Sequence, residues 1–130
     1  MTHAGGRKAA DVFERVRMVG ASLPGVEAST RYDGSPVLKV GGSFMAGLAT
    51  HESAEVDTLV LRYGIEDRQW LLEDAPDTYY LTDYYRKYPL VLVRLARVSE
   101  DALRDLLTVS RTLTLVKTAK HPAARGKTLG

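Results

Sequence analysis

The sequence predicts an α+β fold in which an antiparallel β-sheet carries N- and C-terminal helices on one face. First, segments near both ends have the apolar spacing of amphipathic helices. Second, short β-branched segments between them are separated by turn residues, which is typical of hairpins and antiparallel pairing. Third, the chain has 130 residues, of which 45% are hydrophobic and 26% charged, as expected for one globular domain with its own core.

The first expected element is an amphipathic helix over residues 9–22. Pro24 and Gly25 end it, because proline disfavours helix in the residue before it and glycine tolerates left-handed backbone angles. The residues of its apolar stripe are Val12, Phe13, Val16, Val19 and Leu23.

Four strands are expected next. Asp33-Gly34-Ser35-Pro36 is a turn sequence between the first two, and Gly41-Gly42 suits a two-residue hairpin turn between the second and the third. The fourth strand is rich in Val, Leu and Thr, which favour pleated structure. These strands are expected at residues 29–32, 37–40, 43–49 and 56–62.

A second, shorter helix is expected over residues 65–75. Glu66 and Asp67 fall in its first turn, where the helix dipole favours acids. Ile65 and Leu72 lie on one face, and we expect Trp70 to anchor this helix in the core.

The last part of the sequence predicts two strands and a long helix. Ser99 is the expected N-cap of this helix, followed by acids in its first turn. β-Branched residues alternate from Thr112 to Val116, so we expect the helix to end near Arg111. The strands are expected at residues 78–81 and 89–96, on either side of a tight turn or single helical turn at residues 83–88.

Charge is distributed unevenly along the chain, although the net charge is only +2. Residues 117–130 hold four cations and no acid, so residues 1–116 carry a net charge of −2. Residues 84–99 also hold four cations and no acid, a pattern that marks a surface for an acidic partner or simply a solvated strand. We expect a flexible N-terminus at residues 1–8, a single domain at residues 9–118 and a flexible basic tail at residues 119–130.

The motifs of common catalytic sites are missing from the sequence. There is no cysteine, and His3, His51 and His121 are too far apart to pair on a helix. No dinucleotide fingerprint, complete phosphate loop or nucleophile elbow occurs. We therefore expect a protein without enzymatic activity, without a cofactor and without a metal site.

The sequence also indicates a location and a kind of partner. The lack of cysteine fits a reducing compartment, and neither an apolar leader nor a membrane-length apolar run is present, so we expect a cytoplasmic monomer without a membrane partner. Asparagine is absent and Gln69 is the only glutamine, whereas reading adenine edges uses these side chains. If the partner is DNA, contacts to its backbone or shape are expected rather than base readout.

Several segments of the chain occur in an order that resembles a known family. They are Leu23 to Glu27, Thr30 to Gly34, Ser35 to Gly42 with Phe44, Thr78 to Thr82, Tyr85, Tyr88 to Leu95, and the helix from Leu103 to Ser110. Over about residues 11–118 this order resembles the bacterial MmcQ/YjbR family, whose members are described as DNA-binding proteins. The resemblance implies a frataxin-like (CyaY-like), double-wing fold, and it implies no catalytic or base-reading residues. The family often has His where Asp83 or Tyr84 stands and Trp near Arg111, so any function that needs them is in question here.

Alternation along the strands places three cations, Lys39, Arg62 and Arg94, on one face of the sheet. If the helices cover the other face, these cations line an open face with Tyr80 and Tyr85 nearby, which suits phosphates or stacked bases. The simpler interpretation is that each cation is exposed or paired with an acid. The full set of expected nucleic-acid-binding residues is Lys39, Arg62, Arg86, Lys87, Arg94, Arg97, Lys117 and Lys120.

Three hypotheses about function remain at this stage. The favoured one is weak, salt-dependent DNA binding, assisted by the basic tail. The second is a small-ligand or protein-interaction module that uses the exposed sheet face. The third is frataxin-like metal handling by the acids of residues 66–83, which requires those oxygen ligands to converge in space.

Overall fold

The computed structural model describes residues 4–120, with side chains described for residues 11–117. The element order agrees with the prediction: helix, four strands, short helix, strand, single helical turn, strand and helix. The elements are α1 (Ala4–Ala21), β1 (Val26–Thr30), β2 (Pro36–Val40), β3 (Ser43–Leu48), β4 (Thr58–Arg62), α2 (Arg68–Asp74), β5 (Tyr79–Tyr80), α3 (Asp83–Arg86), β6 (Leu90–Arg94) and α4 (Glu100–Lys120).

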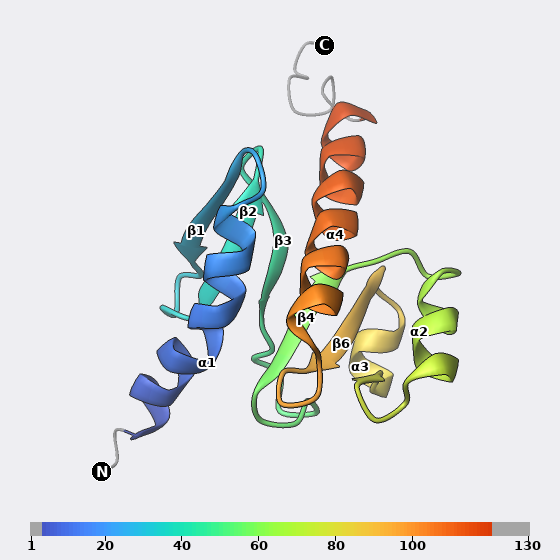
Figure 1. Cartoon of the computed structure of the whole chain (residues 1–130), viewed down its shortest axis with the longest axis horizontal. Coiled ribbons are helices and arrows are strands. Elements are labelled where there is room, and N and C mark those ends of the chain that lie inside the picture. The colour runs from blue at the N-terminus through green and yellow to red at the C-terminus, as the bar shows by residue number, and fades with distance from the viewer. Residues whose placement is uncertain (1–3, 121–130) are drawn as a thin grey trace.

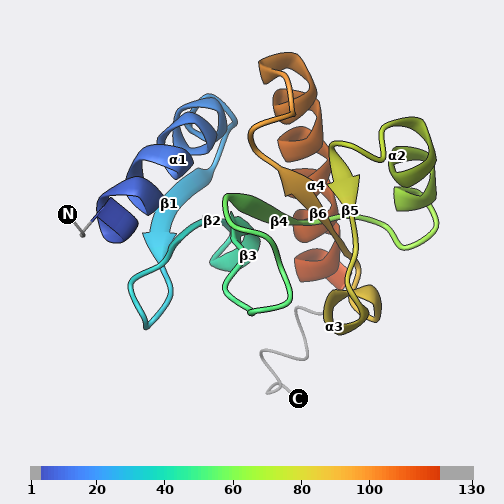
Figure 2. The same ribbon diagram turned by 90° about the horizontal axis from the view of Figure 1, so that it is seen from below.

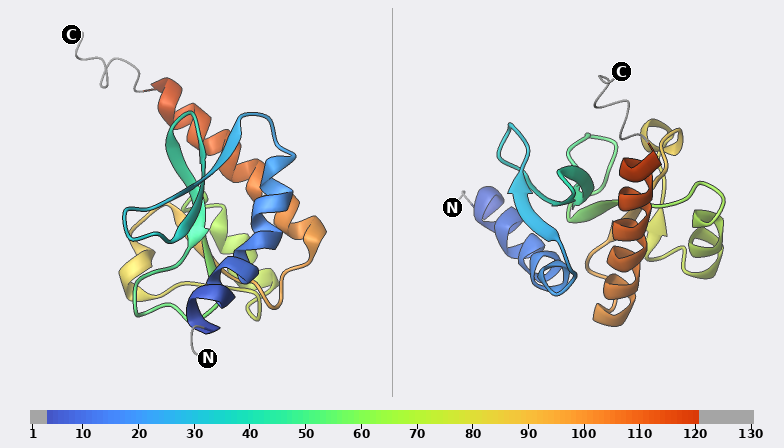
Figure 3. Two further views of the ribbon diagram at one scale, coloured as in Figure 1. Left: turned by 90° about the vertical axis from the view of Figure 1, so that its left-hand side faces the viewer. Right: turned by 90° about the horizontal axis from the view of Figure 1, so that it is seen from above.

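The six strands form one antiparallel sheet in the order β1-β2-β3-β4-β6-β5. Helices α1 and α4 lie side by side over one face of this sheet (Figure 1). The short α3 lies on the opposite side of the sheet (Figure 3). Helix α2 lies beyond the β5 edge (Figure 2). The predicted α+β architecture is therefore confirmed.

The main core lies between the sheet and the two long helices. Val16 on α1 and Leu103 and Leu107 on α4 are fully buried against Leu59 and Leu61 of β4. Val60, which lies between Leu59 and Leu61 on β4, points away from these helices, as strict alternation along a strand requires, and it packs with Leu92 of β6. Most of the apolar stripe predicted for the first helix, namely Phe13, Val16 and Val19, is buried in this core.

Helix α4 continues to Lys120, so the predicted end near Arg111 is wrong. Ser110 and Thr114 are buried on the face that packs against the sheet. The Ser110 hydroxyl donates to the Met45 carbonyl at 2.7 Å, and the Thr114 hydroxyl donates to the Ser110 carbonyl at 2.7 Å. Packing of this face and satisfied hydroxyls outweigh the weak preference of β-branched residues against helix.

The expectation that Trp70 anchors α2 is also wrong, because 75% of its side chain is exposed. The buried residue of this helix is Arg68, which is only 6% exposed. Its guanidinium donates to the carbonyls of Arg86, Tyr88 and Leu90, at 2.6 to 2.9 Å. Arg68 thereby ties α2 to the segment between α3 and β6.

The sheet face opposite the long helices is less open than expected. Val60 and Leu92 are buried there by Tyr85 of α3 and by apolar residues of the β3–β4 loop. These side chains form a second, smaller hydrophobic cluster. The uncovered part of this face lies between α3 and the β1–β2 turn, where Arg31 and Tyr84 line a common pocket.

Some expected boundaries shift by a few residues. The first strand is Val26–Thr30 rather than 29–32, and α1 already begins at Ala4, within the segment expected to be flexible. Residues 1–3 and 121–130, and with them most of the basic tail, lie outside the described residues. No helix in the part of the chain that the structure describes is long and apolar enough to cross a membrane.

Candidate functional site

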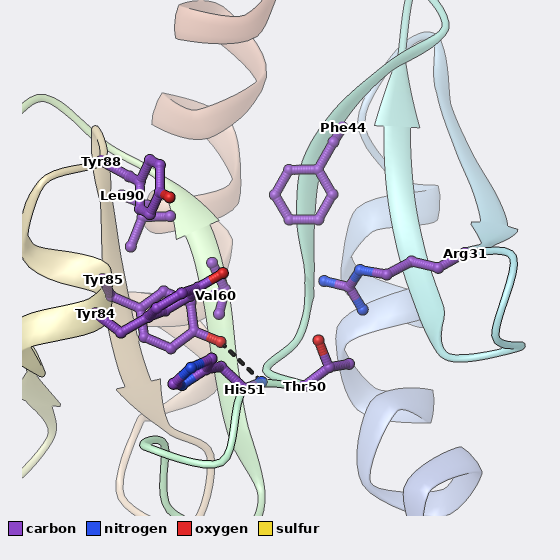
Figure 4. A pocket seen from close by; sticks show the side chains of 9 residues that line it. All are labelled: Arg31, Phe44, Thr50, His51, Val60, Tyr84, Tyr85, Tyr88 and Leu90. Carbon is purple, nitrogen blue, oxygen red and sulfur yellow. Dashed lines mark hydrogen bonds between the residues drawn. The ribbon is translucent and has the colours of Figure 1, made fainter.

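A pocket of about 320 Å³ opens on the sheet face that carries α3 (Figure 4). Tyr84, Tyr85 and Tyr88 form one wall, and Arg31 reaches toward them from the opposite side. Phe44, Val60 and Leu90 line it between these walls, and Thr50 and His51 complete the lining. Segments far apart in the sequence therefore meet at this pocket: the β1–β2 turn, the β3–β4 loop and α3.

The tyrosine wall consists of one fixed ring and two accessible rings. Tyr85 is buried, and its hydroxyl accepts the backbone N–H of His51 at 3.2 Å. Tyr84 and Tyr88 are 41% and 40% exposed. The Tyr84 ring lies 5.0 Å from that of Tyr85 and 5.9 Å from that of Tyr88. The wall thus presents two aromatic rings to the pocket on a rigid base.

His51 fixes the β3–β4 loop against this wall. Its ring stacks on Tyr84 with 3.5 Å between centroids and 7° between planes. Its Nδ1 accepts the backbone N–H of Ser53 at 3.1 Å and contacts the Ser53 hydroxyl at 2.9 Å. That hydroxyl also lies 2.9 Å from the hydroxyl of Thr82, which caps α3. The serine–histidine contact is therefore part of a local turn that joins the loop to α3.

Two cations lie beside the exposed rings. The Lys87 Nζ is 5.8 Å from the ring centroid of Tyr84 and 5.6 Å from that of Tyr88, within cation–π range. Arg31 donates to the Ser35 hydroxyl at 2.8 Å, and its guanidinium carbon lies 5.5 Å from the Phe44 ring centroid. Neither cation takes part in an ion pair among the described residues. The pocket therefore combines aromatic surfaces with positive charge, although Arg31 also interacts with Asp33, which binds the same Ser35 hydroxyl.

Arg94 is not available at this site, because other groups already bind it. Its guanidinium forms two 2.8 Å hydrogen bonds with the Glu55 carboxylate and donates to the carbonyls of Pro76 and Asp77 at 3.1 Å. It also lies over the Tyr80 ring at 4.3 Å. The simpler interpretation, a strand cation paired with an acid, is the right one here.

The structure does not bring Lys39, Arg62 and Arg94 together at one place on the sheet face. All three share a face, but Arg94 lies opposite Thr58 at one end of β4, whereas Arg62 is at the other end. Four residues of strand separate these ends by about 13 Å. Lys39 is further away across the sheet, on β2, opposite Phe44. Arg62 instead lines a smaller pocket with Phe44 that adjoins the main one.

The remaining predicted cations lie in three different places. Arg86 and Lys87 are exposed on and beside α3, and Arg86 is only loosely paired with Asp83 at 3.8 Å. Arg97 is exposed in the turn after β6, near the Arg94 end of the sheet. Lys117 is exposed on α4, on the side of the sheet opposite the pocket, and the side chain of Lys120 lies outside the described part. Only Arg86 and Lys87 are near the tyrosine wall.

Sequence reasoning missed Arg31 and His51 as site residues. Arg31 belongs to the segment Thr30 to Gly34, which carries the family resemblance, and this was the one signal that could have selected it. His51 lies in a loop, where no periodic pattern predicts which side chains it will meet. The acids of residues 66–83 do not converge either, because no group of three or more metal-binding side chains occurs among the described residues.

The Glu55–Arg94 pair makes stability depend on pH in a defined direction. Hydrogen bonds from Arg94 hold the pKa of Glu55 below its usual value. A carboxylate with a lowered pKa stabilises the fold above its unfolded-state pKa, and this contribution is lost as pH falls through the folded-state pKa. The variant Glu55→Gln is therefore expected to have a lower Tm than the natural protein near neutral pH, with the difference shrinking below about pH 4.

Thermal unfolding followed by circular dichroism across this pH range checks the expectation. Glu52→Gln is the matched control, since Glu52 is an exposed acid of the same loop and forms no ion pair among the described residues. A Tm difference for Glu55→Gln that stays constant with pH would contradict the proposed role of the carboxylate.

Comparison with known proteins gives one match to a family. The family model described as YjbR matches residues 21–113, which is well over half of the chain. The matched region runs from the end of α1 to the middle of α4 and includes every residue that lines the pocket. No protein with a curated description matches the sequence.

Proposed function

Because the chain belongs to the YjbR family, we propose that it is a nucleic-acid-binding protein without enzymatic activity and that it holds unpaired bases of a single strand. The observation that carries this proposal is that one pocket combines two exposed tyrosine rings, Tyr84 and Tyr88, with Lys87 beside them and Arg31 on the opposite side. Aromatic rings stack bases, and nearby cations attract the phosphates that connect them.

The position of the cations favours a single strand over a duplex. A duplex is bound by a strip of cations along its backbone, whereas the cations expected from the sequence are scattered on or beside β2, β4, β6, α3 and α4. The bases of a duplex are stacked inside it, so their faces cannot reach Tyr84 and Tyr88. Single-stranded bases are free to do so, and stacking accepts every base without reading its edge.

Replacing both exposed tyrosines tests the proposal. The double variant Tyr84→Ala/Tyr88→Ala is expected to weaken binding of a labelled single-stranded oligothymidylate by about 30-fold or more, because two stacked bases are lost and each contributes about 1–3 kcal/mol. Fluorescence anisotropy at two salt concentrations measures the affinity. The natural protein should bind the single strand more tightly than the matching duplex, and binding should weaken as salt rises.

Trp70→Ala is the control, because Trp70 is equally aromatic and more exposed but lies on α2, outside the pocket. It should leave the affinity unchanged. The proposal fails if the natural protein does not bind the single strand at low salt, or if Trp70→Ala weakens binding as much as the double variant does.

The pocket volume favours a second candidate, a free small ligand. About 320 Å³ lies within the range of small-molecule sites, and the lining suits a planar anion. This matches the expectation of a small-ligand module on the exposed sheet face. Binding measurements distinguish the two candidates. If the pocket serves a free ligand, the protein should bind that ligand and show no affinity for oligonucleotides.

A further inference from the structure

A second, smaller pocket of about 190 Å³ adjoins the first. It shares Phe44, Tyr88 and Leu90 with the main pocket, and Arg62 and Pro89 complete its lining. Arg62 is the last residue of β4 and lies opposite Leu90 in the β4–β6 pairing. Its charge is thus placed in the same small pocket as the Tyr88 ring, among mostly apolar side chains.

The guanidinium of Arg62 is incompletely satisfied. One nitrogen, Nη2, donates to the Phe44 carbonyl at 3.1 Å, whereas the buried Nε has no hydrogen-bond partner. No carboxylate of the described residues forms an ion pair with it. Burial alone lowers the pKa of this guanidinium. Arg62 as a whole is half-buried, but a buried N–H donor without a partner is costly and calls for an explanation.

Arg68 shows what a satisfied buried arginine looks like in the same protein. Its guanidinium donates to three backbone carbonyls, so it serves the fold directly. Arg62 donates to one. The contrast separates a structural arginine from one whose hydrogen-bonding capacity is left for a ligand.

We infer that the Arg62 pocket is a phosphate subsite, which holds the terminal phosphate of a nucleotide whose base lies against Tyr88 in the main pocket. This inference rests on the proposed function and adds that the protein holds a strand by its phosphorylated end. The planar fork of a guanidinium matches the oxygens of a phosphate. Because Tyr88 lines both pockets, one nucleotide can place its base in the main pocket and its phosphate in the adjoining one.

A terminal phosphate fits this place better than one inside a strand. The pocket is small and is lined by Phe44, Tyr88, Pro89 and Leu90 around a single cation. A phosphate within a strand is bonded to nucleotides on both sides, so the pocket would have to admit the chain on both sides of the phosphate. A terminal phosphate is bonded to one nucleotide, so only the end of the chain has to enter. Two sources share this chemistry, namely the phosphorylated end of a strand and a free nucleoside monophosphate.

Competition experiments with matched probes test the inference. The probes are oligothymidylates with a 5′-phosphate, a 3′-phosphate or no terminal phosphate, together with thymidine monophosphate and thymidine. We expect one of the phosphorylated ends to bind about tenfold more tightly than the unphosphorylated strand, the contribution of one charge-assisted contact. Arg62→Met should abolish this preference, while Lys117→Met, which removes the same charge from α4, should retain it.

The stability of Arg62→Met separates a ligand-binding role from a structural one. If Arg62 is kept for a ligand, removing its unsatisfied charge should leave the Tm unchanged or raise it. A lower Tm for Arg62→Met would overturn the inference. So would equal binding of strands with and without a terminal phosphate, an outcome that leaves the proposed function standing.

Failure of the proposed function has a different signature. If no oligonucleotide binds but thymidine monophosphate binds more tightly than thymidine, and only when Arg62 is present, the phosphate subsite is supported with a free nucleotide as its source. If neither oligonucleotides nor thymidine monophosphate bind, both the proposed function and the subsite are overturned.

Discussion

Replacing Arg68 with methionine is expected to destabilise the fold by about 3 to 5 kcal/mol. Methionine fills a similar volume but donates no hydrogen bond. The carbonyls of Arg86 and Leu90 would lose this donor, whereas the Tyr88 carbonyl would keep its second bond, from the backbone N–H of Leu90 at 2.8 Å; each buried acceptor left without a partner costs about 1–3 kcal/mol. Arg68 is only 6% exposed, so water cannot easily replace its guanidinium.

Urea denaturation measures this change in the free energy of unfolding, and the fluorescence of Trp70 reports it from the same helix. Arg62→Met is the matched control, because it makes the same substitution at a half-buried arginine that donates to a single carbonyl, and it is expected to cost nothing. A loss below about 1 kcal/mol for Arg68→Met would show that the three carbonyls find other donors.

This arginine also matters for the candidate site. The segment that it holds, residues 86–90, carries Lys87 and Tyr88, which contribute a cation and an aromatic ring to the pocket. Disrupting Arg68 should therefore weaken nucleic-acid binding even at temperatures where the protein stays folded. Under the proposed function, helix α2 would support the site from outside the pocket.

The second helix shows how far the sequence could predict the fold. Its existence followed from apolar spacing and from Glu66 and Asp67, which were expected in its first turn but lie just before it, because the helix begins at Arg68. Its buried face did not, because hydrophobicity favours Trp70 over Arg68 as the buried residue. An arginine is buried here only because three carbonyls converge on it, and that convergence depends on the path of residues 86–90 rather than on α2 itself.

The candidate site shows the same division between local pattern and tertiary contact. Alternation correctly placed Lys39, Arg62 and Arg94 on one face, because side-chain direction is a local property of a strand. Their separation depends on strand order and register, and the pairing of Arg94 with Glu55 depends on a loop 39 residues away. No periodicity in the sequence contains that information.

Replacing Gly47 with alanine is expected to destabilise the protein by about 2 to 3 kcal/mol and to weaken binding at the pocket. Gly47 lies in β3, opposite Val37 and Val60. A Cβ at this position would lie 2.8 Å from Cγ1 of Val37, 3.0 Å from Cε1 of Phe44 and 3.1 Å from Nη2 of Arg31. Val37 is fully buried and cannot move away, so the added methyl group must displace the strand or its neighbours.

Two of these neighbours, Phe44 and Arg31, line the pocket, so the same methyl group should disturb stability and binding together. Gly64→Ala is the matched control, since its nearest contact would be the mobile carboxylate of Asp67 at 3.3 Å, outside the pocket. Thermal unfolding and anisotropy with the single-stranded probe measure the two effects. Close approach at Gly47 lets the Arg31 guanidinium lie over the sheet, and a Gly47→Ala variant with natural stability and affinity would refute this explanation of how Arg31 reaches the tyrosine wall.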